Sequence, residues 1–291
     1  MKARNKYLIG FFLLIISLTL LAIYSVPDSR LHLIACDVGQ GDAILATYKS
    51  TQMLVDGGPD RRVLDCLSRH MSFWDRKIEV VILTHPQLDH FSGLIDVIKR
   101  YKVDLFVGNA VDNSTQSYRV LKNLVGSKGI RVINPREGLD IRLGSMFLDI
   151  VNPIKKLLTD EPIENKLGTF TTNKDLNDFS VVGTLSFGNF NVLLTGDIGP
   201  NMIDEITATG KIHKVEVLKV PHHGSKNGLT EKLLEVANPD LAIISVGAKN
   251  SFGHPSPEVL KLLSDKAIKT LRTDQMGDVE VISDGKRWWL K

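Results

Sequence analysis

Apolar residues fall along the chain in two patterns: short continuous or alternating runs, and runs with gaps of three or four residues. The first pattern predicts strands near 31–38, 43–48, 53–55, 79–83, 104–107, 130–133, 146–151, 180–187, 189–195, 215–220, 241–246, 269–272 and 278–282. The second predicts helices from 60, at 91–101 and 116–125, from 200, and at 229–236 and 257–264. Strands followed by helices occur twice, which predicts an α/β fold. We expect two mixed sheets packed face to face, helices outside, and a site along their shared edge.

The first thirty residues follow neither pattern. Lys2, Arg4 and Lys6 precede an uncharged run over 7–24. As a helix, this run would be roughly 27 Å long, close to the ~30 Å hydrocarbon core of a membrane. We therefore expect a membrane anchor and a short linker over 1–30, with a secretory signal, cleaved or uncleaved, as the alternative, and one hydrolase domain over 31–291.

The charges around this run predict its orientation. More cations precede the run than follow it, so we expect a single-pass protein of the cytoplasmic membrane with its N-terminus inside and the domain outside. The whole chain has 36 basic and 33 acidic residues. Four of the basic and one of the acidic residues lie in 1–30, so the rest of the chain has 32 of each. A neutral domain has no bulk attraction for nucleic acid.

Cysteine content excludes two classes of protein. The chain has only Cys36 and Cys66, which is neither a disulfide-rich framework nor a cysteine-based zinc site. Cys36 lies within an apolar run and is expected to be a small buried residue. The sequence does not determine whether the two thiols pair.

Metal-binding residue types follow four of the apolar runs. His85, Asp89 and His90 come after the run that ends at Leu83, and Asp197 follows another. Two further segments, 221–225 and 253–255, carry histidines after apolar runs. Carboxylates and imidazoles suit a hard or borderline divalent ion. Four such loops at strand ends predict a metal-dependent hydrolase.

The order of these motifs resembles a known family. The motifs are 37–42 (DVGQGD), 55–58 (VDGG), 84–90 (THPQLDH), 177–181 (NDFSV), 193–197 (LLTGD), 218–225 (LKVPHHGS) and 252–255 (FGHP). Together they resemble the metallo-β-lactamase-like domain of ComEC-type competence proteins, which take up DNA. The resemblance covers about 31–285 and implies a four-layer αββα sandwich. It also implies a DNA phosphodiesterase that uses a metal-activated hydroxide, and we expect its substrate to be single-stranded DNA.

The resemblance implies a set of ligands for one or two divalent ions, Mn²⁺ or Zn²⁺. Matched by position, these are His85, Asp89, His90, Asp197 and His254.

Other matched positions imply catalytic or supporting roles. His222 or His223 would lie beside the scissile phosphate as proton donor or charge stabiliser, and we count Asp89 with the catalytic residues. Neighbouring residues of an extended segment point to opposite faces, so only one of the two histidines is expected to reach the site. Asp56 is implied to order the ligand loops without touching the metal.

Two positions depart from the pattern of the wider superfamily. Gln87 stands in place of the second histidine of His-x-His-x-Asp-His, and the segment with Asn177 and Ser180 replaces a lone ligand histidine. These residues are either supports for the ligands or ordinary loop residues. We therefore expect two unequal metal sites, one firm and one weak.

Several alternatives stay open. The polar segment 154–177 is expected to form a mobile loop over a site, and Lys219 and Lys226 are candidate phosphate-binding cations. One anchor forms no pore, so the protein either works with a separate DNA-uptake channel or is a free-standing surface nuclease. The competing functions are hydrolysis of a small ester or lactam on the same fold, and a catalytically degenerate domain that binds DNA or a partner.

Overall fold

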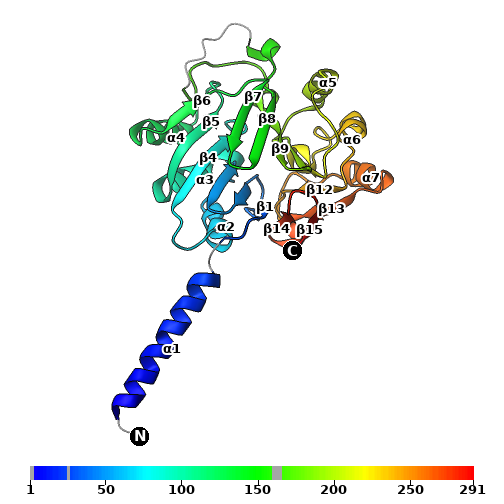
Figure 1. Ribbon diagram of the computed structural model, residues 1–291. Helices are drawn as coiled ribbons and strands as arrows, with labels where there is room; N and C mark the ends of the chain where they lie inside the picture. Colours follow the sequence, from blue (N-terminus) through cyan, green and yellow to red (C-terminus); the bar gives the residue numbers. More distant parts are fainter. Residues whose placement is uncertain (1–2, 25–26, 159–165) are drawn as a thin grey trace.

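Two β-sheets lie face to face at the centre of the molecule, with helices on both outer faces (Figure 1). The computed structural model describes residues 3–24, 27–158 and 166–291; the side chains of 3–6, 18 and 20–24 lie outside this description. This architecture confirms the prediction of an αββα sandwich.

The first sheet has the strand order β15-β14-β1-β2-β3-β4-β5-β6. Strands β3, β4, β5 and β6 are parallel, and the others are antiparallel. The bounds are β1 Leu31–Ala35, β2 Ile44–Tyr48, β3 Thr51–Val55, β4 Lys77–Leu83, β5 Lys102–Gly108, β6 Arg131–Ile133, β14 Val279–Ser283 and β15 Trp288–Leu290.

The second sheet has the order β13-β12-β11-β10-β9-β8-β7, in which β10 to β13 are parallel. The bounds are β7 Leu139–Leu143, β8 Met146–Asn152, β9 Val182–Phe187, β10 Phe190–Leu194, β11 Val217–Lys219, β12 Leu241–Ile244 and β13 Lys269–Arg272. The predicted strands did not include β7, although its Asp140 and Arg142 alternate with three apolar residues, a pattern that indicates a strand with one face buried.

Helices cover each sheet on its outer face. The first sheet carries α2 (Arg62–His70), α3 (Leu88–Arg100) and α4 (Gln116–Ser127), which share a buried apolar cluster with it. The second carries α5 (Pro200–Ala208), α6 (Glu231–Ala237) and α7 (Pro257–Asp265), which share another. The remaining short elements are η1 Lys155–Leu158, η2 Leu176–Phe179, η3 Pro221–Gly224 and α8 Thr273–Met276.

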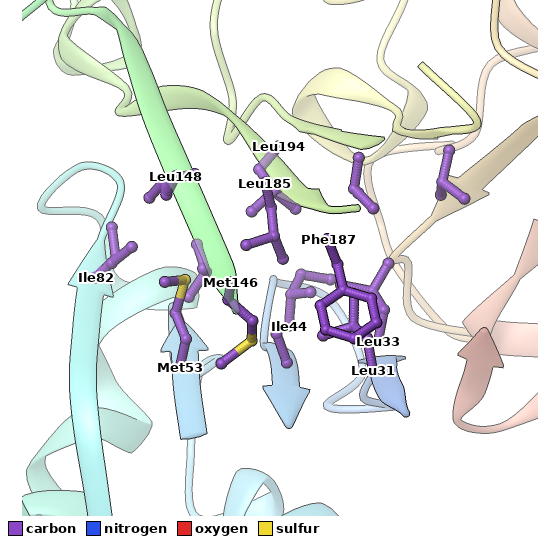
Figure 2. Close-up of a cluster of buried hydrophobic side chains, with 14 of the residues drawn as sticks. Leu31, Leu33, Ile44, Met53, Ile82, Met146, Leu148, Leu185, Phe187 and Leu194 are labelled. Atoms are coloured by element: carbon purple, nitrogen blue, oxygen red, sulfur yellow. The ribbon is translucent and has the colours of Figure 1, made fainter. Parts of the chain in front are cut away.

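The central core lies between the two sheets. In Figure 2, Leu33, Met53 and Ile82 of the first sheet face Leu148 and Leu185 of the second. Each of these side chains is no more than 2% exposed. Burying an aliphatic side chain of this size contributes about 1.5–3 kcal/mol, so these contacts fix the relative position of the sheets.

The carboxyl ends of the parallel strands determine where a site can form. Strands β3, β4 and β5 are parallel in one sheet, as are β10, β11 and β12 in the other. The motifs with Asp56, His85, Asp197 and His223 follow β3, β4, β10 and β11, respectively. Ligands in open α/β sheets bind beyond the carboxyl ends of the strands, and here two such edges meet.

Cys36 and Cys66 form a disulfide that links the end of β1 to α2. Both residues are fully buried. The sequence predicted the burial of Cys36 but not the pairing, because a separation of 30 residues says nothing about distance in space.

Helix α1 (Ala3–Tyr24) precedes the domain (Figure 1). Within the described part of the chain, no helix is both long enough and apolar enough to cross a membrane. The predicted anchor over 7–24 is therefore not confirmed. Part of it falls on side chains outside the described set, and the boundary between 1–30 and 31–291 stays a prediction.

Candidate metal centre

Asp89 and His90 lie in the first turn of α3. This helix begins at Leu88 rather than at Phe91 as predicted, because Gln87 is extended and serves as its N-cap. Helical geometry directs both side chains toward the sheet edge. His90 is fully buried, whereas the Asp89 side chain is 31% exposed and lies where solvent reaches the site.

Asp56 holds His90 in one orientation. Its Oδ2 accepts a hydrogen bond from His90 Nδ1 at 2.8 Å and from the Thr84 hydroxyl at 2.7 Å, and its Oδ1 accepts from the Thr84 amide. Because Nδ1 donates to the carboxylate, Nε2 of His90 is the nitrogen that faces the site, and it becomes a ligand atom when it loses its proton. A carboxylate behind a histidine is the usual support for a metal ligand.

Asp197 enters the site from the loop after β10. Its amide donates to the Ser180 hydroxyl at 3.2 Å, which fixes the loop against η2. Its Oδ2 lies 3.3 Å from His90 Nε2 and 3.2 Å from His223 Nε2. Asp197 is therefore the carboxylate that joins the two halves of the site.

His223 completes the group from the second sheet. Its Nδ1 donates to the Ser245 carbonyl at 3.0 Å, and its Nε2 lies 3.3 Å from Asp89 Oδ2. His222 and His223 both have left-handed backbone angles, with φ of 51° and 54°. The expectation of an extended segment was wrong, because 221–224 forms a short 3₁₀ turn, η3. Two consecutive residues in this region are costly and are typical of functional sites.

Four side chains thus offer donor atoms to one point. Asp89, His90, Asp197 and His223 each have a candidate ligand atom within 4.8 Å of all the others. Of the nine buried side-chain atoms that lack a hydrogen-bond partner among the described residues, three belong to this group: Nε2 of His90, Nε2 of His223 and Oδ1 of Asp197. Buried polar atoms are rarely left without a partner. A divalent cation would satisfy all three.

The electrostatics of the group also fit a cation. Burial lowers the pKa of His90 and of His223, but Asp197 and the other neighbouring carboxylates together outweigh it, and each pKa lies well above its usual value. Burial raises the pKa of Asp197, but the two histidines hold it well below its usual range. Protons on the imidazoles therefore balance the buried carboxylates. Metal binding would replace these protons.

His85 lies beside this group rather than within it. Its ring centroid is 4.2 Å from that of His90, and its Nδ1 is 3.1 Å from the Thr84 hydroxyl. Burial, and then the neighbouring His90, lower the pKa of His85 to about 3, so its imidazole is neutral. Its buried Nε2 has no hydrogen-bond partner among the described residues. The side chain therefore has the tautomer and the lone pair of a ligand.

His222 and His254 form the rim of the site. Their ring centroids are 5.8 Å apart, and both side chains are half-buried. His254 is not among the four residues that converge, although its buried Nδ1 also lacks a partner in the described structure. Of the five ligands that the resemblance implied, the structure brings Asp89, His90 and Asp197 together. It adds His223 and leaves His85 and His254 alongside.

The two departures from the superfamily pattern contact each other. Gln87 Nε2 donates to Asn177 Oδ1 at 2.8 Å. Asn177 is buried at the start of η2, where the Asp175 side chain caps its amide. Through this hydrogen bond, the end of the segment 154–177 contacts the loop that contains Gln87. Its residues 159–165 lie outside the described ones, so the predicted loop over the site is not tested there.

Sequence reasoning missed Asp42 and misread Lys219. Lys219 Nζ lies 2.5 Å from Asp42 Oδ2, and both residues are buried. Lys219 is therefore not the exposed phosphate-binding cation that was expected, whereas Lys226 is exposed. Asp42 Oδ1 in turn lies 3.4 Å from His223 Nδ1. The sequence did contain a sign of its role, because Asp42 is the last residue of motif 37–42. It follows Gly41, where any side chain would collide with the Asp89 carbonyl.

Comparison with known proteins agrees with this site. A family model described as the metallo-beta-lactamase superfamily matches residues 36–248. The chain is 26% identical over 286 residues to ComE operon protein 3 of Bacillus subtilis, covering 90% of this chain and 34% of that protein. It is 26% identical over 280 residues to Recombination protein 2 of Haemophilus influenzae, covering 94% and 31%. The chain spans about a third of the length of these curated relatives.

Solved structures show the same fold at low identity. The metallo hydrolase Igni18 of Ignicoccus hospitalis has a TM-score of 0.53 at 15% identity, covering 86% of this chain and 98% of that one. The metallo-beta-lactamase fold protein YhfI of Bacillus subtilis has a TM-score of 0.51 at 11% identity, covering 83% and 95%. The chain therefore belongs to the metallo-beta-lactamase superfamily, whose fold is that of metal-dependent hydrolases, and competence proteins are among its relatives.

Proposed function

We propose that this protein is a metal-dependent phosphodiesterase that cleaves DNA, single-stranded DNA in particular, during DNA uptake. The observation that carries the proposal is the convergence of Asp89, His90, Asp197 and His223 on one point, with three buried donor atoms that lack a partner among the described residues. Two carboxylates and two imidazoles suit Mn²⁺ or Zn²⁺. When bound, such an ion polarises a phosphate oxygen and lowers the pKa of water.

The residues around this group have separate roles in the proposal. Asp56 and the Ser245 carbonyl orient His90 and His223 so that Nε2 of each faces the ion. Asp89 is the ligand open to solvent, so the substrate phosphate approaches along its side. His222 is half-buried at the rim beside His254, and we assign it the role of proton donor to the leaving oxygen.

The relatives support DNA as the substrate class. Competence protein ComA of Neisseria gonorrhoeae is 23% identical over 259 residues, and the other two relatives are named for a competence operon and for recombination. This chain corresponds to about a third of such proteins. We propose that the domain acts on DNA during uptake, in keeping with the names of these relatives.

Substrate turnover by the full-length chain tests the proposed function. The chain, purified in detergent, is given Mn²⁺, Zn²⁺ or Mg²⁺ together with labelled single-stranded DNA, duplex DNA, RNA, a chromogenic phosphodiester or a lactam. We expect cleavage of single-stranded DNA that requires the metal. Asp89→Ala and His90→Ala should each reduce kcat/KM by about 100-fold or more, as expected for lost metal ligands.

Matched substitutions on the surface serve as controls. Asp204→Ala and His213→Ala change the same residue types at exposed positions and should keep full activity. Turnover of the lactam instead of DNA would favour the small-molecule hydrolase. Tight DNA binding without cleavage under any metal would favour the degenerate binding domain.

We also propose that the domain lies outside the cytoplasm. The Cys36–Cys66 disulfide supports this location, because such bonds persist in oxidising compartments and are rare in the cytosol. Thiol labelling of the protein in intact cells, after rapid quenching in acid, tests it. We expect both cysteines to resist labelling until a reductant is added. Two labelled thiols without reductant would place the domain inside.

A further inference from the structure

The end of the first sheet opposite the metal centre has an unusual surface. Strands β3 to β6 run parallel, so their amino ends share one edge. β4 has seven residues and separates this edge from the metal-binding loop by roughly 20 Å. We call this surface the basal pole and define it as residues 49–51, 71–77, 99–103 and 128–131.

The basal pole carries an excess of unpaired positive charge. Five exposed cations there form no ion pair with any described residue: Lys49, Arg76, Arg100, Lys128 and Arg131. Of the nearby carboxylates, Asp104 pairs with Lys77 and Lys102, and Asp96 pairs with Lys99. Asp75 accepts hydrogen bonds from the Gln52 side chain and the Lys77 amide, so this one carboxylate offsets only part of the positive charge. A groove of about 460 Å³ runs between the end of α3 and the turn after α4, and Lys99, Arg100, Lys102 and Lys128 line it. Its charge is complementary to an anionic surface.

Two large aromatic residues project from the same pole. Phe73 is 66% exposed and Trp74 is 47% exposed, and their rings meet edge to face with centroids 4.9 Å apart. Exposed aromatic pairs of this size on a loop are not explained by packing within the domain. Tryptophan beside cations is the usual composition of a surface that rests at a membrane–water interface.

The chain also reaches the domain at this pole. Phe73 lines a cavity of about 540 Å³ together with Pro27, Asp28 and Lys49. The segment that follows α1 is therefore a neighbour of the aromatic loop. The basal pole is therefore the part of the domain that lies nearest to α1 (Figure 1).

We infer that the basal pole docks on an anionic lipid surface, with Phe73 and Trp74 in the interfacial layer and the five cations on lipid phosphates. Nucleic acid is less well matched to this pole. The two rings pack edge to face against each other rather than offering successive parallel faces to bases, and the metal centre lies at the far end of the sheet. Docking in this orientation holds the metal-binding edge away from the bilayer and open to substrate.

The test uses the full chain with vesicles of phosphatidylcholine alone or mixed equally with phosphatidylglycerol. Lipid brominated near the headgroup quenches the fluorescence of any tryptophan that enters the interface. The difference in fluorescence between the wild type and Trp74→Phe gives the signal of Trp74 alone. We expect this difference signal to be quenched by the anionic vesicles. A water-soluble amine reagent should label Lys49 and Lys128 several-fold more slowly on anionic vesicles, whereas Lys174 and Lys249 keep their rates. Added salt should reverse the protection.

Charge reversal separates this pole from other contacts with lipid. Arg100→Glu with Lys128→Glu should abolish the quenching of Trp74 and the protection of Lys49. The matched pair Lys174→Glu with Lys249→Glu, also at exposed positions, should not. Equal labelling of all four lysines with and without anionic vesicles would overturn the inference. Protection of Lys49 and Lys128 by a single-stranded oligonucleotide without lipid would overturn it too, in favour of a nucleic-acid surface.

Discussion

Gln87 donates a hydrogen bond to Asn177 at 2.8 Å, and this contact joins the two places, Gln87 and the segment with Asn177 and Ser180, where we expect the chain to depart from the histidine pattern of its superfamily. The two substitutions are therefore one structural change: an amide pair joins the ligand loop to η2. An amide bonded to another amide offers little to a transition metal compared with an imidazole. This relationship supports a site in which one ion is held firmly and a second weakly.

Restoring both histidines should add a metal ion. We expect Gln87→His with Asn177→His to raise the metal bound after dialysis from about one ion per chain toward two, because two imidazoles replace the amide pair beside His85. Elemental analysis of the dialysed protein measures the ratio. Gln275→His, at an exposed position on α8, is the control for an added histidine. An unchanged ratio in a folded double variant would contradict the proposed inequality of the sites.

Asp56 should matter for metal affinity although it is not expected to touch the metal. Its backbone has a φ of 61°, a conformation that asparagine also tolerates, so Asp56→Asn keeps the loop and removes only the carboxylate behind His90. We expect the metal Kd to rise by roughly 10–100-fold. Competition with a fluorescent chelator measures it, with the exposed Asp240→Asn as control. A Kd equal to that of the wild type would remove Asp56 from the site.

Asp278 should make stability depend on acid pH. Its carboxylate accepts hydrogen bonds from Arg69, His70 and the Asp37 amide. Burial raises its pKa, but His70 and the other donors outweigh this and lower the pKa from 3.8 to about 2. Because the pKa is lower in the folded than in the unfolded state, the carboxylate stabilises the protein at pH values above its unfolded-state pKa. This stabilisation is lost as the pH falls from about 4 to about 2.

Urea unfolding of wild type and Asp278→Asn over this range measures the effect. The wild type should be more stable by about 1–2 kcal/mol near pH 5, with the difference shrinking toward pH 2. A difference that stays constant down to pH 2 would show that the carboxylate acts through packing rather than charge.

The sequence predicted the layers of the fold because they depend on periodic burial. Runs such as Val80 to Leu83 lie at the centre of a sheet with both faces covered, and their pattern is unambiguous. β7 was overlooked, although its alternation of apolar residues with Asp140 and Arg142 is that of a strand with one face buried. Helix α3 was placed three residues late because 88–90 were assigned to the metal-binding loop, although Leu88 lies three residues before Phe91, which is a helical spacing.

The sequence predicted which residue types gather at the site, but not how they divide the work. His222 and His223 are adjacent, and only the left-handed backbone of η3 determines that His223 is buried and His222 lies at the rim. Asp42 precedes Lys219 by 177 positions, so no local pattern joins them. Such pairings depend on the packing of the two sheets.

The buried pair of Asp42 and Lys219 gives a test in which stability and metal binding separate. Lys219 Nζ also donates to the Val220 carbonyl, and both charges are shielded from solvent. Lys219→Met alone leaves a buried carboxylate beside His223, and Asp42→Asn alone leaves a buried ammonium. We expect each to cost about 3–5 kcal/mol of unfolding free energy, and the double variant to be more stable than either, because no unpaired charge remains.

Metal affinity should not recover in the same way. The double variant lacks the carboxylate that lies 3.4 Å from His223 Nδ1, so only the Ser245 carbonyl still orients that ring. We expect its metal Kd to stay about 10-fold above the wild-type value even where urea unfolding shows regained stability. If the single effects on stability simply add in the double variant, the two groups do not act as a pair. If affinity recovers together with stability, Asp42 stabilises the fold and has no part in holding His223.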